Sequence, residues 1–181
     1  MNIQEARRGI DAEVREILRL DQYWNKCYPC RQGGVCCRGA NVLALLPELA
    51  DIHDLLENTP ETKSYALQQI LLGRDCIFYR EDAQSCLVHD RRPLLCRLTP
   101  FKGLSGKGEI TVFVEGSGGC RDFAMRTLPV ESRDGRYVRA GGRVYFDIRN
   151  LFSSGGKHPN ELTSNVRSYF EKIYSHPPGS A

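Results

Sequence analysis

Cysteines constrain this chain more than any other residue type, because eight of them occur in 181 residues and seven fall into two groups. The upstream group holds four thiols within eleven residues, and the three downstream thiols are separated by nine residues each. In chain order the eight are Cys27, Cys30, Cys36, Cys37, Cys76, Cys86, Cys96 and Cys120. We expect the chain between the two groups to bring them together.

Metal ligation explains these clusters better than disulfides or buried thiols do. The first twenty residues carry acids and lack the apolar segment of a secretory signal, and no run reaches the roughly 18 apolar residues of a membrane helix. We therefore expect a cytoplasmic protein, and disulfides are rare in that reducing compartment. Buried thiols without metal would have no reason to gather near glycines. Thiolates are soft ligands that suit Zn²⁺ and the iron of iron–sulfur clusters.

The upstream cysteines are predicted to lie in a loop, because a glycine pair precedes Cys36 and glycine lets the backbone approach an ion closely. The spacing Cys27-x2-Cys30 allows two sulfurs to converge on one ion. Adjacent residues of an extended backbone point to opposite sides, so Cys36 and Cys37 are predicted to have different roles.

Basic residues surround the last downstream cysteine, and they have a physical use in a thiolate site. Four thiolates carry negative charge that is costly to bury unpaired. Arg92 and Arg97 are predicted to offset this charge and to donate hydrogen bonds to sulfur. His89 is predicted to lie beside these arginines and not to bind the metal itself. Arg91 is interpreted as surface charge. No catalytic residue stands out, and the other histidines are predicted to face solvent: His53, His158 and His176.

The pattern of apolar residues predicts an α+β fold: a small, irregular, cysteine-organised domain with about four helices and a few short antiparallel strands. Helical spacing predicts helices over 3–20, 47–57, 61–72 and 160–174, the last capped by Asn160. Short strands are predicted over 76–79, 86–88 and 110–115, and a hairpin over 136–148 with its turn at Gly141-Gly142.

The length of the chain suits a single domain over residues 1–181. Its metal-binding core is predicted over 27–120. The N-terminal helix, within 1–22, and the C-terminal hairpin and helix, within 125–175, are expected to pack on that core.

The net charge of +3 is small, and acids are interleaved with the arginines of residues 121–149. A nucleic-acid partner is therefore not expected. The expected partner is a metal ion or cluster, and a protein partner is left open.

The downstream motif Cys86-Leu-Val-His89-Asp-Arg-Arg92-Pro93-Leu-Leu-Cys96-Arg97, with Cys76 and the upstream cysteines, resembles the CxxCxxCC family, also called the YkgJ-type zinc- or iron-chelating domain. The resemblance runs from about residue 27 to residue 120. The five-residue gap before Cys36 is longer than the family name describes. Thr99 stands where the family usually has an aromatic residue before Pro100.

The resemblance implies metal chelation. All eight cysteines are candidate metal ligands, which could form two four-cysteine sites or one cluster with spare thiols. The resemblance implies an iron–sulfur cluster, of the 4Fe–4S type, or alternatively Zn²⁺. Flagellin lysine N-methylases share the cysteine pattern, but this chain is short and shows no methyl-donor loop, so that activity is not transferred.

Three hypotheses follow for the function. The first is a cytoplasmic metal-binding protein with an accessory or redox role. The second is a cluster-dependent enzyme, either an oxidoreductase or a protein-lysine methyltransferase. The third is a zinc-stabilised module that binds a macromolecule through the arginine-rich residues 121–149.

Overall fold

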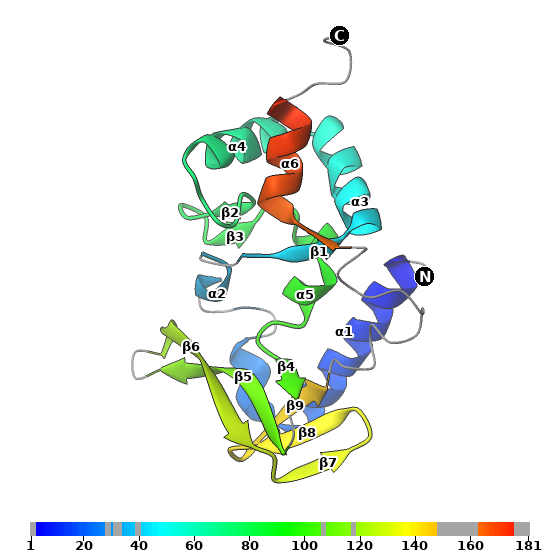
Figure 1. Ribbon diagram of the computed structural model, residues 1–181, viewed down its shortest axis with the longest axis vertical. Coiled ribbons are helices and arrows are strands. Elements are labelled where there is room, and N and C mark those ends of the chain that lie inside the picture. The colour runs from blue at the N-terminus through cyan, green and yellow to red at the C-terminus, as the bar shows by residue number, and fades with distance from the viewer. Residues whose placement is uncertain are drawn as a thin grey trace. The chain divides into compact units, whose positions relative to one another are not determined.

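Helices and short strands, nearly all paired antiparallel, make up the protein in the computed structural model (Figure 1), which confirms the α+β class. The structure describes residues 3–27, 30, 34–38, 41–105, 108–116, 119–147 and 163–175. The chain divides into two compact units: unit 1 comprises Met1–Gln32 and Arg97–Lys157, and unit 2 comprises Gly33–Cys96 and His158–Ala181. The single domain over 1–181 stays a prediction.

Unit 1 begins with helix α1, Ile3–Leu20, as predicted over 3–20. Its apolar residues recur at helical spacing, so Ile10, Val14 and Ile17 fall on one face and are almost fully buried. Burying side chains of this size contributes about 1.5–3 kcal/mol each. The 3₁₀ helix η1, Gln22–Lys26, follows directly and buries Trp24.

A six-stranded sheet also belongs to unit 1, in the order β6-β5-β4-β9-β8-β7. Its strands are β4 Lys102–Ser105, β5 Glu109–Gly116, β6 Gly119–Pro129, β7 Ser132–Asp134, β8 Tyr137–Ala140 and β9 Arg143–Asp147. The β4–β9 pair is parallel and the other pairs are antiparallel. Figure 1 shows β5 and β6 as a long ribbon beside the smaller β7–β8–β9 meander.

The predicted hairpin over 136–148 is confirmed as β8 and β9. Gly141 and Gly142 have φ angles of +57° and +70°, the left-handed conformation that a two-residue hairpin turn requires. Strand β6 was not predicted. Its sequence mixes glycine, charged and apolar residues without clear alternation, and its pairing with β5 makes it a strand.

Unit 2 packs three helices over one core: α3 Leu46–Glu57, α4 Pro60–Leu71 and α6 Val166–Ser175. The helices predicted over 47–57 and 61–72 are confirmed. Strand β1, Leu43–Leu45, pairs with β10, Thr163–Asn165, and so joins the two chain segments of the unit. The core includes Leu49, Ile52 and Phe170, each fully buried.

Two predictions in unit 2 are wrong. The last helix begins at Val166, where Asn165 accepts a hydrogen bond from the backbone N–H of Ser168; the predicted cap, Asn160, lies outside the described residues. His53 is half-buried rather than solvent-facing, because its ring stacks on Phe170 and Tyr174 at centroid distances of 6.4 and 6.1 Å. His158 and His176 lie outside the described residues.

Candidate metal centre

Two of the downstream cysteines are held by a short hairpin of unit 2. Strands β2, Tyr79–Arg80, and β3, Ser85–Cys86, pair so that Tyr79 lies opposite Cys86. Strand β2 begins and ends later than the predicted 76–79, whereas β3 begins and ends earlier than the predicted 86–88. Cys76 precedes the hairpin, and both thiols pack against the core of unit 2. The apolar core therefore determines how deeply the sulfurs of Cys76 and Cys86 are buried.

The third downstream cysteine lies on helix α5, Leu94–Arg97, the short helical turn after Pro93. One buried carboxylate ties this turn to helix α3. The two oxygens of Glu48 accept hydrogen bonds from the backbone N–H groups of Leu94, at 2.7 Å, and Leu45, at 3.0 Å. Glu48 is only 1% exposed. It therefore fixes the segment that carries Cys96 to the helical part of the unit.

Cys36 and Cys37 lie on the short helix α2, Val35–Arg38. The prediction that an extended backbone points them to opposite sides is wrong. Their thiols form a hydrogen bond with each other, which is the largest cause of a raised pKa at Cys37. The two adjacent sulfurs therefore share one environment.

The turn before α2 needs a glycine at position 34. Gly34 has a φ of +60°, and a Cβ there would lie 3.1 Å from Cε2 of Tyr79 and 3.9 Å from the sulfur of Cys37. Its carbonyl accepts a hydrogen bond from the backbone N–H of Cys37 at 2.8 Å. The upstream backbone is thereby held against the β2–β3 hairpin within unit 2.

Four thiols of unit 2 lie close enough to act on one another electrostatically. Burial is the largest cause of the raised pKa of Cys76, Cys86 and Cys96, and it brings the pKa of Cys86 to about 12. The charge of a Cys37 thiolate raises the pKa of all three. The charges of Cys76 and Cys86 likewise raise the pKa of Cys96. Cys37, Cys76, Cys86 and Cys96 therefore form one group, hereafter the thiol cluster. The charge of Cys36 raises the pKa of Cys37 as well, so Cys36 borders this cluster.

Arg92 is the cation of the thiol cluster. Its positive charge lowers the pKa of Cys37, Cys86 and Cys96, which partly offsets burial and thiolate repulsion. The Nη1 group of Arg92 donates to Nε2 of His89, an exposed residue of the 3₁₀ helix η2, His89–Arg91. His89 thus contacts the arginine that acts on the cluster.

The other two arginines of the motif have carboxylate partners. Nη1 of Arg97 lies 3.0 Å from Oδ2 of Asp11, within unit 1. Nη1 of Arg91 lies 2.9 Å from Oδ1 of Asp51, within unit 2, so Arg91 is more than surface charge. The role of Arg97 in offsetting thiolate charge stays a prediction.

The remaining cysteines are distributed unevenly. Cys27 and Cys30 belong to unit 1, where Cys27 ends η1. The backbone of Cys120 lies in β6, and its side chain is outside the described residues. No disulfide joins the seven cysteines whose side chains are described. Within the described part of the chain, no group of three or more His, Cys, Asp or Glu side chains is arranged to hold a metal ion.

Sequence reasoning missed Glu48. A glutamate three residues after Leu45, next to Pro47, is the pattern in which a glutamate at the third helical position accepts a hydrogen bond from the residue before the helix. That pattern could have identified the contact with Leu45. The contact with Leu94 joins residues 46 apart in sequence, and only the tertiary structure could place it.

The thiol cluster, four thiols with one arginine, has the donor chemistry of a cysteine-rich metal-binding protein, although its side chains are not arranged around a metal ion in this structure. A family model described as a putative zinc- or iron-chelating domain, CxxCxxCC, matches residues 26–134, which is more than half of the chain. The chain belongs to the CxxCxxCC family. Comparison with curated proteins and with solved structures found no match. Among the described residues, no helix is long and apolar enough to cross a membrane.

Proposed function

We propose that this cytoplasmic protein holds one iron–sulfur cluster on the thiol cluster, Cys37, Cys76, Cys86 and Cys96. The observation that carries the proposal is that the charge of the Cys37 thiolate raises the pKa of the other three thiols, and that the charges of Cys76 and Cys86 also raise the pKa of Cys96. Such repulsion favours a cation among them. Four thiolates are the ligand set of a 4Fe–4S cluster and also of a structural Zn²⁺ site.

The polypeptide supplies two further functions at this centre. Burial raises the pKa of the thiols, so a metal must displace protons from them, and Arg92 reduces that cost by stabilising the thiolate forms. Glu48 and Gly34 hold the segments that carry Cys96 and Cys37. The bound centre would supply electron transfer if it is an iron–sulfur cluster and structural stability if it is zinc.

The biological role we propose is accessory or redox, in line with the first sequence hypothesis. The described site contains thiols that can act as metal ligands, together with the cation Arg92. These groups suit metal binding and electron transfer. An enzyme that uses the cluster is the alternative.

Anaerobic purification followed by metal and sulfide analysis tests the occupant. The proposal predicts a brown protein with iron and acid-labile sulfide in equal amounts and broad visible absorption. A colourless protein with stoichiometric zinc would contradict the cluster and support a structural role. Reversible bleaching by a reductant would support the redox role.

Single Cys→Ser substitutions test the ligands. Loss of metal is expected for substitutions at Cys37, Cys76, Cys86 and Cys96. Cys30→Ser distinguishes this centre from a second one, because Cys30 is an exposed cysteine of unit 1. Full metal content in all four variants would refute the site.

The wider prediction of eight ligands is tested by the same series. Substitution of Cys27, Cys30, Cys36 or Cys120 that removes about half of the metal would indicate a second centre. Retention of all metal in these four variants would limit the ligands to the thiol cluster.

A further inference from the structure

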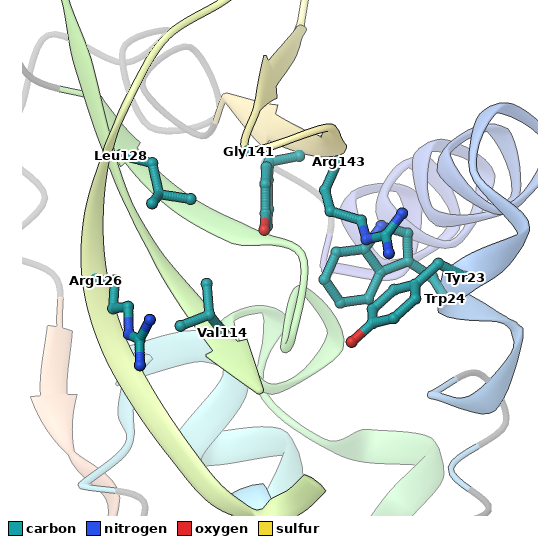
Figure 2. A pocket seen from close by; sticks show the side chains of 8 residues that line it. Tyr23, Trp24, Val114, Arg126, Leu128, Gly141 and Arg143 are labelled. Carbon is teal, nitrogen blue, oxygen red and sulfur yellow. The ribbon is translucent and has the colours of Figure 1, made fainter. Parts of the chain in front are cut away.

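Unit 1 contains a pocket of about 250 Å³ that the metal centre does not use (Figure 2). Helix η1 contributes Tyr23 and Trp24, and strand β9 contributes Arg143 and Tyr145. Strands β5 and β6 form the other side, where Figure 2 shows Val114 and Arg126 facing the aromatic side chains. The pocket therefore lies between the aromatic residues of η1 and β9 and the long β5–β6 ribbon.

The base of the pocket is aromatic and rigid. Trp24 is 3% exposed and Tyr145 is 2% exposed, and their rings meet edge to face with centroids 5.6 Å apart. Trp24 also packs edge to face against Phe101 at 5.4 Å. Val114 and Leu128 add apolar surface opposite these rings. A flat, apolar ligand would gain from burial against such a wall.

The rim of the pocket is positively charged. It carries Arg126 and Arg143, and none of the described residues that line it is acidic. The guanidinium of Arg143 lies 3.8 Å from the centroid of Tyr23, and Nζ of Lys26 lies 4.0 Å from the same centroid. Two cation–π contacts therefore hold the ring of Tyr23 beside the pocket.

One carboxylate reduces this charge only in part. Oδ1 of Asp21 lies 3.9 Å from Arg143, at the outer limit of an ion pair, while Arg126 is exposed on β6. The net charge beside the aromatic base is therefore positive. A guanidinium binds carboxylate and phosphate groups through paired hydrogen bonds.

We propose that this pocket binds a small aromatic anion, a single ring that carries a carboxylate or a phosphate group. The ring would pack against Trp24 and Tyr145, and the anionic group would be attracted by the charges of Arg126 and Arg143, which Figure 2 shows on opposite sides of the pocket. The volume of about 250 Å³ is below the roughly 300–1,000 Å³ of pockets for drug-sized ligands, which favours one ring over a larger molecule.

The single tryptophan of the chain reports on this site directly, since Trp24 lines the pocket. The probes are phenyl phosphate and benzoate, with benzyl alcohol as the uncharged analogue, titrated into the purified full-length protein. We expect a saturable change in Trp24 emission with a dissociation constant on the order of 1 mM or lower for at least one anion. Benzyl alcohol should bind about tenfold more weakly or not at all.

Arginine variants give the test its specificity. Arg126→Gln and Arg143→Gln should each weaken anion binding about tenfold or more. Arg139→Gln is the matched control, because Arg139 is exposed on the neighbouring strand β8 and does not line the pocket. Circular dichroism should show that all three variants are folded. If Arg143→Gln is not folded, Arg126→Gln still tests the proposal, because Arg126 is exposed.

Binding of only one of the two anions supports the proposal and identifies the anionic group. The proposal is overturned if neither anion gives a saturable change up to about 10 mM. It is also overturned if benzyl alcohol binds as tightly, or if Arg139→Gln weakens binding as much as Arg126→Gln does. Binding of a single-stranded oligonucleotide without binding of either small anion would instead indicate a nucleic-acid surface.

Discussion

Glu48 shows how one buried residue can organise the thiol cluster. Its two carboxylate oxygens accept the N–H groups of Leu45 and Leu94. Glu48→Gln has the same shape but places an amide N–H₂ opposite one of those donors. We expect it to lower the free energy of unfolding by about 2–4 kcal/mol, since a buried N–H then lacks an acceptor.

Urea denaturation measures the effect of Glu48→Gln. Glu61→Gln is the control, because Glu61 is an exposed glutamate in the first turn of α4 and should change stability by less than about 0.5 kcal/mol. Equal stabilities for the two variants would show that the Glu48 contacts contribute little.

Arg92 makes the second prediction at the scale of one residue. Its charge favours the thiolate forms of Cys37, Cys86 and Cys96. Arg92→Ala should therefore lower metal affinity by about tenfold, whereas Arg92→Lys should retain part of it, because a lysine keeps the charge but loses the planar guanidinium. Competition with a chelator measures both. Affinities unchanged by Arg92→Ala would contradict the role of the charge.

At the scale of an element, the turn before α2 depends on Gly34. Gly34→Ala forces an L-residue into a φ of +60° and brings a methyl group 3.1 Å from the ring of Tyr79. We expect a loss of stability of about 1–2 kcal/mol and a lower metal content.

Gly9→Ala is a matched control for Gly34→Ala. A Cβ at Gly9, within helix α1, meets nothing within 4 Å, so alanine should stabilise the protein by about 0.5–1 kcal/mol. Thermal denaturation of both variants checks that Gly34→Ala lowers the stability and that Gly9→Ala raises it. A stable, fully metallated Gly34→Ala protein would rule out the tight approach at that turn.

Strand β9 gives a prediction about pH. Burial raises the pKa of Tyr145 from 10.0 to about 12. The unfolded chain therefore loses the proton at a lower pH than the folded chain, so this contribution to stability is present below pH 10 and is lost as the pH rises through about 12. Denaturation at pH 9 and at pH 11, monitored by Trp24 fluorescence, measures the stability lost between the two pH values. This loss should be smaller in Tyr145→Phe than in the unsubstituted protein. An identical loss in both proteins would contradict the shift.

At the scale of the whole molecule, the two compact units are expected to respond differently to metal removal. The thiol cluster belongs to unit 2, whereas the six-stranded sheet belongs to unit 1. Chelation should therefore increase amide hydrogen exchange in α3, α4 and α6 and leave the β8–β9 hairpin protected. Uniform exchange across both units would show that the metal stabilises the chain as a single cooperative unit.

The sequence alone determined the local elements and the chemistry of the thiols. Helices over 3–20, 47–57 and 61–72 and the hairpin at Gly141-Gly142 were predictable, because apolar spacing and glycine act within a few residues. Cysteine spacing also indicated the family. These properties depend on side-chain type and on short separations along the chain.

Only the tertiary structure decided which thiols form a group and what surrounds them. The charge of a Cys37 thiolate raises the pKa of Cys96 although 59 positions separate the two residues in the numbering, and Cys27 and Cys30 belong to the other unit. The contact between Glu48 and Leu94 and the aromatic pocket likewise arise from packing between distant segments. Burial and long-range charge depend on the folded chain, and they have no counterpart in local sequence patterns.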